Sequence, residues 1–192
     1  MYMDEGMDTG DIILKQEIQI GEDETTGELW NRMAIIGGNL LVETLNNISK
    51  GTAPRKKQEG NFSIAPMLDK DIAKIDWENK NAFEIKNLVR GLNPIMGAYS
   101  FINNKKVKFW KVKNIEFESF LAEHKENINI EMQQLCDLEN GIVVLSNDKD
   151  GLYIKAKDGI ICVLEIQGEN SKRMKINDFL RGNKIELNSK FI

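Results

Sequence analysis

The chain has 192 residues, of which 41% are hydrophobic and 29% charged, and its formal net charge is −4. This length holds one ordinary domain or two small ones, and the charge balance excludes a histone-like polycation. No apolar run is long enough to span a membrane and no signal peptide opens the chain, so we expect no membrane association and a cytoplasmic location.

The first fifty residues predict a strand and a helix that follow an acidic turn. The turn holds Asp4, Glu5, Asp8 and Asp11, and residues 12–20 alternate loosely as a strand does. Thr25 and Glu28 form a capping box, which predicts a helix from there to about Ser49. Its apolar residues fall at helical spacing and predict one buried stripe: Leu29, Met33, Ile36, Leu40, Leu41, Leu45 and Ile48.

Glycines and prolines mark the next boundaries. Gly51 suits the left-handed end of the first helix, and Gly37-Gly38 inside it predicts close approach of a neighbouring element. Residues 52–70 have two of the three prolines and no periodicity, which is typical of a surface linker. A short helix follows, capped by Asn79 or Asn81, with Ala82, Ile85, Leu88 and Leu92 facing inward.

From Gly97 onward the hydrophobic period becomes two. Strands are predicted over 98–102, 106–113, 128–134, 141–146, 151–156 and 160–166, then a short helix beginning near Asn177 and a terminal strand. Short strands joined by turns such as "NDKDG" and "KDG" favour a small antiparallel barrel. We therefore expect an α/β fragment followed by a mainly-β, OB-like barrel.

The cysteines and the single histidine predict no metal or redox site. Cys136 and Cys162 form no CxxC motif, and their apolar neighbours favour small buried side chains in a reducing compartment. His124 lies in "AEHKEN", whose charged residues predict a surface position.

Several sequence blocks together resemble a known family. "MDEGMDTGDI" resembles the acidic turn of the formyltransferases that use 10-formyltetrahydrofolate, and "AKIDW", "IKNLVRGLNP", "GAYSF" and "VKFWKV" are similar to the start of their C-terminal barrel. "KDGLYIKAKDGIICVLEIQ" and "KRMKINDFLRG" are similar to the end of those members that act on methionyl-tRNA. The resemblance implies three regions: residues 1–51 from the last part of a Rossmann-like catalytic domain, the linker 52–70, and a tRNA-binding barrel over 71–192.

The resemblance also implies a mechanism and one catalytic residue. The amino group of methionine carried by initiator tRNA attacks the formyl carbon of 10-formyltetrahydrofolate. An Asn and a His, in a part of the family's domain expected to precede Met1, stabilise the charge on the formyl oxygen. Asp8 matches the family carboxylate that orients this His and helps remove the proton from the amine. Gly6 and Gly10 would bring the backbone close to the folate. The isolated chain is expected to be inactive, and the full enzyme monomeric.

Basic residues on the barrel are the expected tRNA contacts, because lysines and arginines neutralise phosphates regardless of sequence. In strict alternation Lys106 and Lys108 would share a face with Trp110, so a bulge is predicted near Phe109. Trp77 and Trp110 are predicted to be core residues. The candidate tRNA-binding residues are Lys70, Lys106, Lys108, Lys111, Lys113, Lys172 and Arg173.

Two other functions stay open. A sugar-nucleotide N-formyltransferase shares the acidic turn but would bind a nucleotide-linked amino sugar and no tRNA. A non-catalytic tRNA-binding remnant would bind tRNA without formyl transfer, even when the missing half is supplied.

Overall fold

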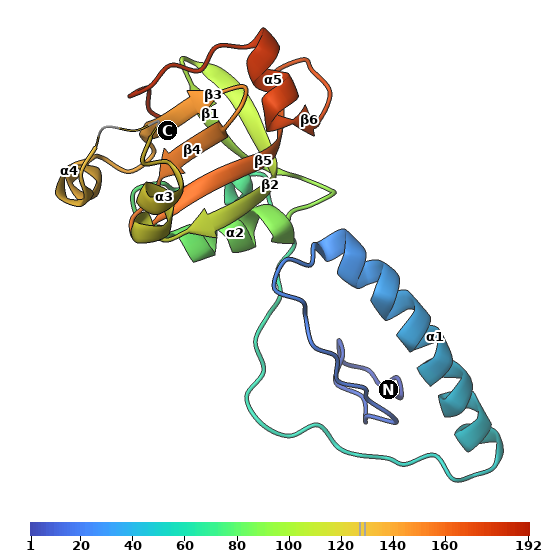
Figure 1. The fold of residues 1–192 in the computed structure, drawn as a ribbon. Coiled ribbons are helices and arrows are strands. Elements are labelled where there is room, and N and C mark those ends of the chain that lie inside the picture. The colour runs from blue at the N-terminus through green and yellow to red at the C-terminus, as the bar shows by residue number, and fades with distance from the viewer. Residues whose placement is uncertain (127, 129) are drawn as a thin grey trace. The chain divides into compact units, whose positions relative to one another are not determined.

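A computed structural model describes residues 1–126, 128 and 130–192 of the chain (Figure 1). Contacts divide the chain into two compact units, Met1–Met67 and Leu68–Ile192.

The Met1–Met67 unit holds an opening turn, one long helix and two extended segments (Figure 1). Helix α1 spans Thr26–Ser49. It begins at the predicted capping box: the Glu28 N–H donates to the Thr25 hydroxyl (3.3 Å), and the Thr25 N–H donates to the Glu28 carboxylate (2.8 Å). Gly51, with φ +68°, follows its end in the left-handed conformation. The predicted limits of this helix are confirmed.

The strand predicted over residues 12–20 is wrong. Within the described residues this segment pairs only through a bridge between Ile12 and Lys56, whose backbone groups exchange hydrogen bonds of 2.8 and 3.0 Å. A strand needs a neighbour along its whole length, and this unit supplies one at a single position.

The buried stripe predicted on α1 is also wrong, because no residue of this helix is buried. Several of its large apolar side chains are about half exposed, among them Trp30 at 57% and Leu45 at 56%. A Cβ placed on Gly37 or Gly38 would meet nothing within 4 Å, so the close neighbour expected there is not among the described residues.

The Leu68–Ile192 unit is a six-stranded antiparallel sheet with short helices around it (Figure 1). Its elements are the 3-10 turn η1 (Asp71–Ala73), α2 (Ala82–Gly91), β1 (Ala98–Ile102), β2 (Lys105–Ile115), α3 (Phe117–Glu123), α4 (Met132–Asp137), β3 (Val143–Asn147), β4 (Gly151–Lys155), β5 (Ile160–Gly168), β6 (Met174–Lys175) and α5 (Ile176–Gly182). The strand order is β1-β2-β5-β4-β3, with β6 paired to β5. The mainly-β character is confirmed, but the strands themselves form an open sheet.

The two outer strands are joined by the last residues of the chain. Phe101 of β1 exchanges two backbone hydrogen bonds of 2.9 Å with Ile192. Val143 of β3 donates to the Ser189 carbonyl (2.9 Å) and accepts from the Asn188 N–H (3.0 Å). In place of the predicted terminal strand, residues 188–192 therefore bond to both edges of the sheet without forming a regular strand.

One predicted strand of this unit is wrong. Of the segment 128–134, residue 129 lies outside the described residues, and Met132 begins helix α4. A capping box of Glu131 and Gln134 opens this helix. Ile128 and Ile130 pack against a small apolar cluster, so the alternation that predicted a strand comes from residues that precede the helix.

Turn chemistry explains the hairpins that were predicted correctly. Asn103 and Asn104 join β1 to β2 with φ of 50° and 61°, as a two-residue turn with two left-handed residues requires. In the "KDG" turn between β4 and β5, the Asp158 carboxylate accepts the Ala82 N–H at 2.8 Å. This turn therefore also caps α2, which begins after Asn81 as predicted.

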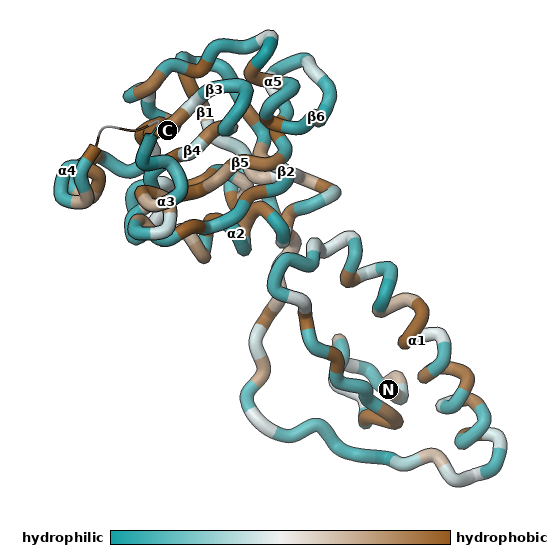
Figure 2. The backbone as a smooth tube through the Cα atoms, in the orientation of Figure 1, coloured by the Kyte–Doolittle hydropathy of each residue, from teal (hydrophilic) through white to brown (hydrophobic). Residues whose placement is uncertain are grey.

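The main core lies between α2 and the sheet. Ile85 and Val89 of α2 pack there against Trp77, which precedes this helix. Phe109 of β2 and residues of β4 and β5 complete this core. Trp77 is 2% exposed and its indole N–H donates to the Ser100 hydroxyl at 2.9 Å, which confirms it as a core residue. Figure 2 shows the corresponding hydrophobic segments within the sheet.

A second, smaller cluster corrects the sequence predictions for His124 and Cys136. His124 is 5% exposed and packs against the rings of Phe120 (5.1 Å between centroids) and Tyr153 (4.6 Å). Cys162 is buried in this cluster as expected, whereas Cys136 is exposed. The surface position was predicted from the charged residues next to His124, but its burial depends on Tyr153 of β4, which is distant in sequence.

This cluster gives a testable pH dependence. Burial raises the pKa of the Tyr153 phenol and that of the Cys162 thiol. For a raised pKa, the stabilising effect is complete below the ordinary value and is lost as pH rises through the folded-state value. Urea unfolding at pH 8 and pH 11 should therefore show that Tyr153→Phe costs less stability at pH 11. Tyr99→Phe, outside this cluster, is the control, and an equal cost of Tyr153→Phe at both pH values would contradict the expectation.

Candidate active-site turn and nucleic-acid interface

Hydrogen bonds to the Asp4 side chain and to the Asp11 backbone hold the opening turn together. The Asp4 carboxylate accepts hydrogen bonds from the Gly6 N–H (3.1 Å) and the Thr9 hydroxyl (2.5 Å). The Asp11 carbonyl accepts from the Tyr2 N–H at 2.8 Å. These contacts fold residues 1–11 back on themselves.

Asp8 has the left-handed conformation (φ 56°) and an exposed side chain. Asp and Asn adopt this conformation more readily than most residues, which suits Asp8 to the tip of the turn. The side-chain amide of Gln58 donates to the backbone carbonyls of Asp8 and Gly10, both at 2.8 Å. Gln58 lies in the segment predicted as a linker, and sequence reasoning gave no sign of this contact. The turn is thus anchored through its backbone, with the Asp8 carboxylate exposed.

Gly6 and Gly10 are positions where the turn has no room for a side chain. A Cβ on Gly10 would overlap the Tyr2 carbonyl, and one on Gly6 would overlap the Thr9 hydroxyl. A cavity of about 260 Å³ lies along this turn and is lined by residues from Met1 to Gly10, Asp8 among them.

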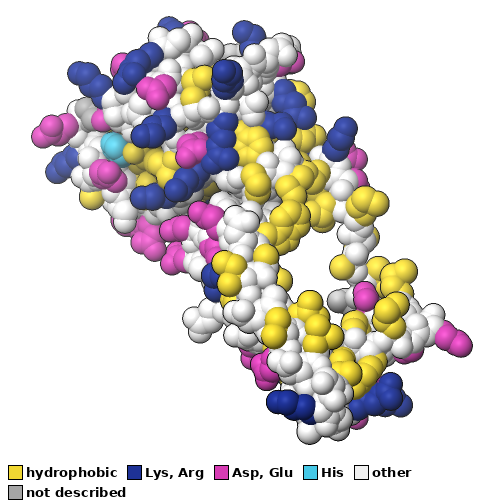
Figure 3. All heavy atoms as spheres, turned by 90° about the vertical axis from the view of Figure 1, so that its right-hand side faces the viewer, with side chains coloured by type: hydrophobic (Ala, Val, Ile, Leu, Met, Phe, Trp, Pro, Cys, Tyr) yellow, Lys and Arg dark blue, Asp and Glu magenta, His cyan; other side chains and the backbone are white. Residues whose placement is uncertain are grey.

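The second candidate site is the outward face of β2. Val107, Phe109 and Val112 are buried, whereas Lys111 and Lys113 are exposed. The register between β2 and β5 shifts between Phe109 and Lys111 and again before Val112. This is the predicted bulge, and it keeps Lys111 and Lys113 outward after Trp110 interrupts the alternation. Figure 3 shows several Lys and Arg side chains on the visible face of the Leu68–Ile192 unit, in the upper part of that view.

Three of the predicted basic residues contact aromatic rings. The Lys106 amine lies 3.5 Å from the centroid of the Tyr99 ring. Lys108 and Arg173 both lie over the Trp110 ring, at 5.5 and 5.2 Å. Trp110 is 8% exposed, which confirms its predicted place in the core.

Lys108 and Arg173 are also held by hydrogen bonds. The Lys108 amine donates to the Met96 carbonyl (2.9 Å), and Arg173 forms an ion pair with Glu165 (2.5 Å) and donates to the Asn93 side chain (3.2 Å). These two residues therefore support the local structure as well as adding positive charge.

The other predicted basic residues are less constrained. Lys70, Lys111, Lys113 and Lys172 are exposed, and within the described part of the chain no carboxylate forms an ion pair with any of them. Their charges are available to a bound anion.

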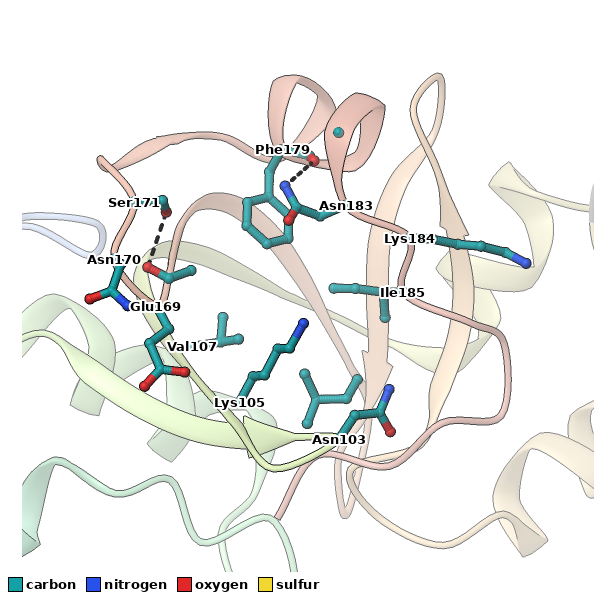
Figure 4. Close-up of a pocket in the computed structure, with 13 residues that line it drawn as sticks. Asn103, Lys105, Val107, Glu169, Asn170, Ser171, Phe179, Asn183, Lys184 and Ile185 are labelled. Carbon is teal, nitrogen blue, oxygen red and sulfur yellow. Dashed lines mark hydrogen bonds between the residues drawn. The ribbon is translucent and has the colours of Figure 1, made fainter.

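A cavity of about 540 Å³ lies near the turn between β1 and β2, and sequence reasoning did not find it (Figure 4). Val107, Phe179 and Ile185 give it apolar walls, and the Lys105 side chain extends into it. The Asn183 amide donates to the Phe179 carbonyl at 3.0 Å and shapes one side. An anionic or hydrogen-bonding group of a ligand could meet Lys105 here.

The described residues contain no cluster of His, Cys, Asp and Glu able to hold a metal ion. The helices that the structure describes include none with the length and hydropathy of a membrane span.

The class of protein follows from comparison with family models. The chain matches the model described as "Formyl transferase, C-terminal domain" over residues 67–184 and the one described as "Formyl transferase" over residues 1–45. The chain therefore belongs to the formyl transferase family. The match over residues 1–45 covers the acidic turn and most of α1. The match over residues 67–184 covers nearly all of the Leu68–Ile192 unit.

Curated relatives give a more particular likeness. The chain is 40% identical over 191 residues to a methionyl-tRNA formyltransferase of Ruminiclostridium cellulolyticum, covering 99% of the chain and 56% of the relative. Methionyl-tRNA formyltransferases of Halothermothrix orenii and Clostridioides difficile are 38% and 39% identical over 187 residues, covering 97% of the chain and 55% and 54% of the relatives. The chain thus spans about half the length of the curated relatives that it matches.

Solved structures agree in fold. A crystal structure of HypX from Aquifex aeolicus superposes with a TM-score of 0.63 at 15% identity, covering 96% of this chain and 30% of that one. A second HypX structure, in complex with tetrahydrofolic acid, gives a TM-score of 0.61 at 14% identity and covers 96% and 32%. At such low identity the likeness concerns the fold alone.

Proposed function

We propose that this chain is the turn-bearing and tRNA-binding part of a methionyl-tRNA formyltransferase, which formylates the amino group of methionyl initiator tRNA in the cytoplasm. The observation that carries the proposal is the identity of 36–40% to proteins of that name along almost the entire chain. The relatives are about twice as long, so formyl transfer belongs to this chain together with the rest of the catalytic domain.

Asp8 is the proposed catalytic residue of this chain. Its side chain is exposed on a turn whose backbone is held by hydrogen bonds from the Gln58 amide. A carboxylate there can orient a neighbouring imidazole, favour its protonated form and help remove the proton from the attacking amine. The groups that stabilise charge on the formyl oxygen would come from the rest of the domain.

The proposed formyl donor is 10-formyltetrahydrofolate, which supplies the carbon that the amine attacks. The turn offers such a donor a cavity of about 260 Å³ that includes Asp8, and the turn takes this form only with glycine at positions 6 and 10, where a Cβ would overlap Thr9 or Tyr2. Gly6 and Gly10 are accordingly proposed to shape the donor site.

The proposed tRNA surface is the basic face of β2 with Lys70, Lys172 and Arg173. We further propose an OB-like form for this unit, which the bonds of residues 188–192 to both outer strands support. Lysines that neutralise phosphates make affinity fall with salt, and each lost contact reduces the slope of log K against log salt by about 1. Lys111→Ala combined with Lys113→Ala should therefore reduce that slope by about 2 in a tRNA-binding titration. Lys149→Ala, in the turn between β3 and β4, should leave it unchanged. If the double variant keeps the same slope of log K against log salt, Lys111 and Lys113 do not contact tRNA and the proposed surface on β2 is wrong.

A formylation assay tests the whole proposal. The chain alone should transfer no formyl group to methionyl initiator tRNA, whereas the chain co-expressed with the remaining part of a relative should do so. Transfer to a nucleotide-linked amino sugar, with no tRNA binding, would replace the proposal with a sugar-nucleotide N-formyltransferase. Salt-sensitive tRNA binding without transfer by the assembled protein would make the chain a binding remnant.

A further inference from the structure

The cavity of about 540 Å³ beside the turn between β1 and β2 has no part in the proposed function. Its size lies in the range of small-molecule sites, about 300–1,000 Å³. The residues that line it come from the β1–β2 hairpin, the end of β5, the loop before β6, and α5 with the residues after it (Figure 4). Elements distant in sequence therefore converge on one hollow.

Part of the cavity wall is apolar and preformed. Its buried apolar side chains are Ile102, Val107, Phe179 and Ile185. Gly168 permits this arrangement, because a Cβ there would lie 2.9 Å from the Phe179 ring. The Ser171 hydroxyl donates to the Gly168 carbonyl (3.0 Å), and the Gln167 amide donates to the Ser171 carbonyl (2.9 Å), so the loop beside this wall is held in place. Such a wall suits the flat or apolar body of a ligand.

The polar side chains of the lining have unused bonding capacity. The Lys105 side chain extends into the cavity, and no carboxylate of the described residues pairs with it. The side-chain amide of Asn103 forms no hydrogen bond within the described part of the chain. The Asn183 amide donates to the Phe179 carbonyl at 3.0 Å, which leaves its side-chain oxygen as an acceptor. The lining thus offers one cation and two amides to a ligand.

This combination favours a nucleoside monophosphate over simpler ligands. An inorganic anion would bind Lys105 but leave the apolar wall in contact with water, and a purely apolar molecule would leave the ammonium without a counterion. A nucleobase has an apolar face and an edge of donors and acceptors that asparagine amides match. A phosphate forms charge-assisted hydrogen bonds with a lysine ammonium.

We propose that this cavity binds a nucleoside monophosphate. The base lies on the apolar wall with its edge toward the amides of Asn103 and Asn183, and the phosphate binds Lys105. The nucleotide is free or is an unpaired residue of an RNA strand, because both present the same groups. The inference requires neither formyl transfer nor the lysines proposed above as tRNA contacts.

Titration of the isotope-labelled chain with AMP, CMP, GMP and UMP tests the proposal. At least one of them should bind saturably, with a dissociation constant below about 1 mM, and shift the methyl NMR signals of Ile102, Val107 and Ile185. The methyl signals of Leu135 and Ile160, in the smaller apolar cluster, should stay in place. The matching nucleoside should bind about tenfold more weakly, because it lacks the group that meets Lys105.

Two lysines of the lining give matched variants. Lys105→Met removes the charge, so the nucleotide should bind no more tightly than its nucleoside. Lys184 forms an ion pair with Glu186 (3.2 Å) and extends away from Lys105 in Figure 4, so Lys184→Met should change the affinity less than about threefold. Unchanged methyl spectra of the free variants show that both fold.

A third variant tests the contact with the base. Asn103→Gly keeps a residue that tolerates the left-handed turn (φ 50°) and removes the side-chain amide. It should weaken binding of the nucleotide and of its nucleoside by the same factor, because the base edge is common to both.

A short single-stranded RNA that contains the preferred base distinguishes the two sources. If the RNA displaces the mononucleotide and shifts the same methyl signals, the cavity takes a residue of an RNA strand. If the mononucleotide stays bound in the presence of the RNA, the free nucleotide is the ligand.

The proposal is wrong if none of the four mononucleotides binds saturably, or if binding leaves the cavity methyl signals unshifted. Equal effects of Lys105→Met and Lys184→Met would also overturn it. None of these readouts depends on formyl transfer, so a failed formylation assay would contradict the proposed function and leave this site standing.

Discussion

Asp8→Asn should lower the rate constant of formyl transfer by the assembled enzyme about 10²- to 10³-fold, with little change in affinity for tRNA. Asparagine has nearly the same shape as aspartate and also tolerates the left-handed conformation that residue 8 adopts (φ 56°). The hydrogen bonds of Gln58 go to backbone carbonyls and should persist. The substitution therefore removes the charge and the proton acceptor while keeping the turn.

Single-turnover formylation, with this chain assembled with the rest of a formyl transferase domain, measures the effect of Asp8→Asn. Asp4→Asn is the matched control, because the Asp4 side chain accepts hydrogen bonds from Gly6 and Thr9 within the turn and an amide oxygen can still accept them. A loss in Asp4→Asn as large as that in Asp8→Asn would show that the turn needs its negative charge in general. An active Asp8→Asn enzyme would remove Asp8 from the mechanism.

Phe109→Ala should lower the free energy of unfolding of the Leu68–Ile192 unit by about 3–5 kcal/mol. Phe109 is fully buried, and its ring packs edge-on against Trp77 (6.0 Å between centroids) and Phe191 (5.4 Å). Truncation leaves a cavity between β2, the segment before α2 and the C-terminal residues, and these belong to different parts of the fold that cannot easily collapse together.

Urea unfolding followed by tryptophan fluorescence measures the cost of Phe109→Ala. Phe83→Ala is the control, because Phe83 lies on the outer face of α2 and is 51% exposed. Its cost should stay within about 0.5 kcal/mol. A cost below about 1 kcal/mol for Phe109→Ala would show that the three rings are not the centre of the core.

Local sequence signals predicted local structure well. The capping box at Thr25 predicted the start of α1, and Asn79 or Asn81 as the cap predicted the start of α2, where the structure selects Asn81. Both signals come from residues within about one helical turn of the helix start. Alternation predicted five strands of the sheet and, through its failure at Trp110, the bulge in β2. These features depend on contacts between residues close in sequence or on a simple inside–outside pattern.

The errors concern contacts with partners distant in sequence. Residues 12–20 alternate like a strand, but only Ile12 finds a partner, at Lys56. His124 has charged sequence neighbours yet is buried by Tyr153, 29 positions further along the chain. The stripe on α1 has the pattern of a buried face, although nothing described covers it.

For the candidate sites, sequence reasoning proposed residues but gave no sign of the contacts that hold them. The resemblance to the formyltransferases singled out Asp8 and the lysines of β2, but no sequence pattern indicated that Gln58 fixes the turn. Nor did any pattern indicate that Lys108 and Arg173 would lie over the same indole ring. Such side-chain contacts depend on the packing of the unit that holds them.

The bonding of residues 188–192 to both β1 and β3 has a consequence for biosynthesis. The ribosome delivers a chain from its N-terminus, so these residues leave the exit tunnel after every strand of the sheet. Until then both outer strands present unpaired backbone groups, which are templates for pairing with another nascent chain. Pairing of residues 188–192 is thus the step that closes both outer strands, β1 and β3, to such intermolecular pairing.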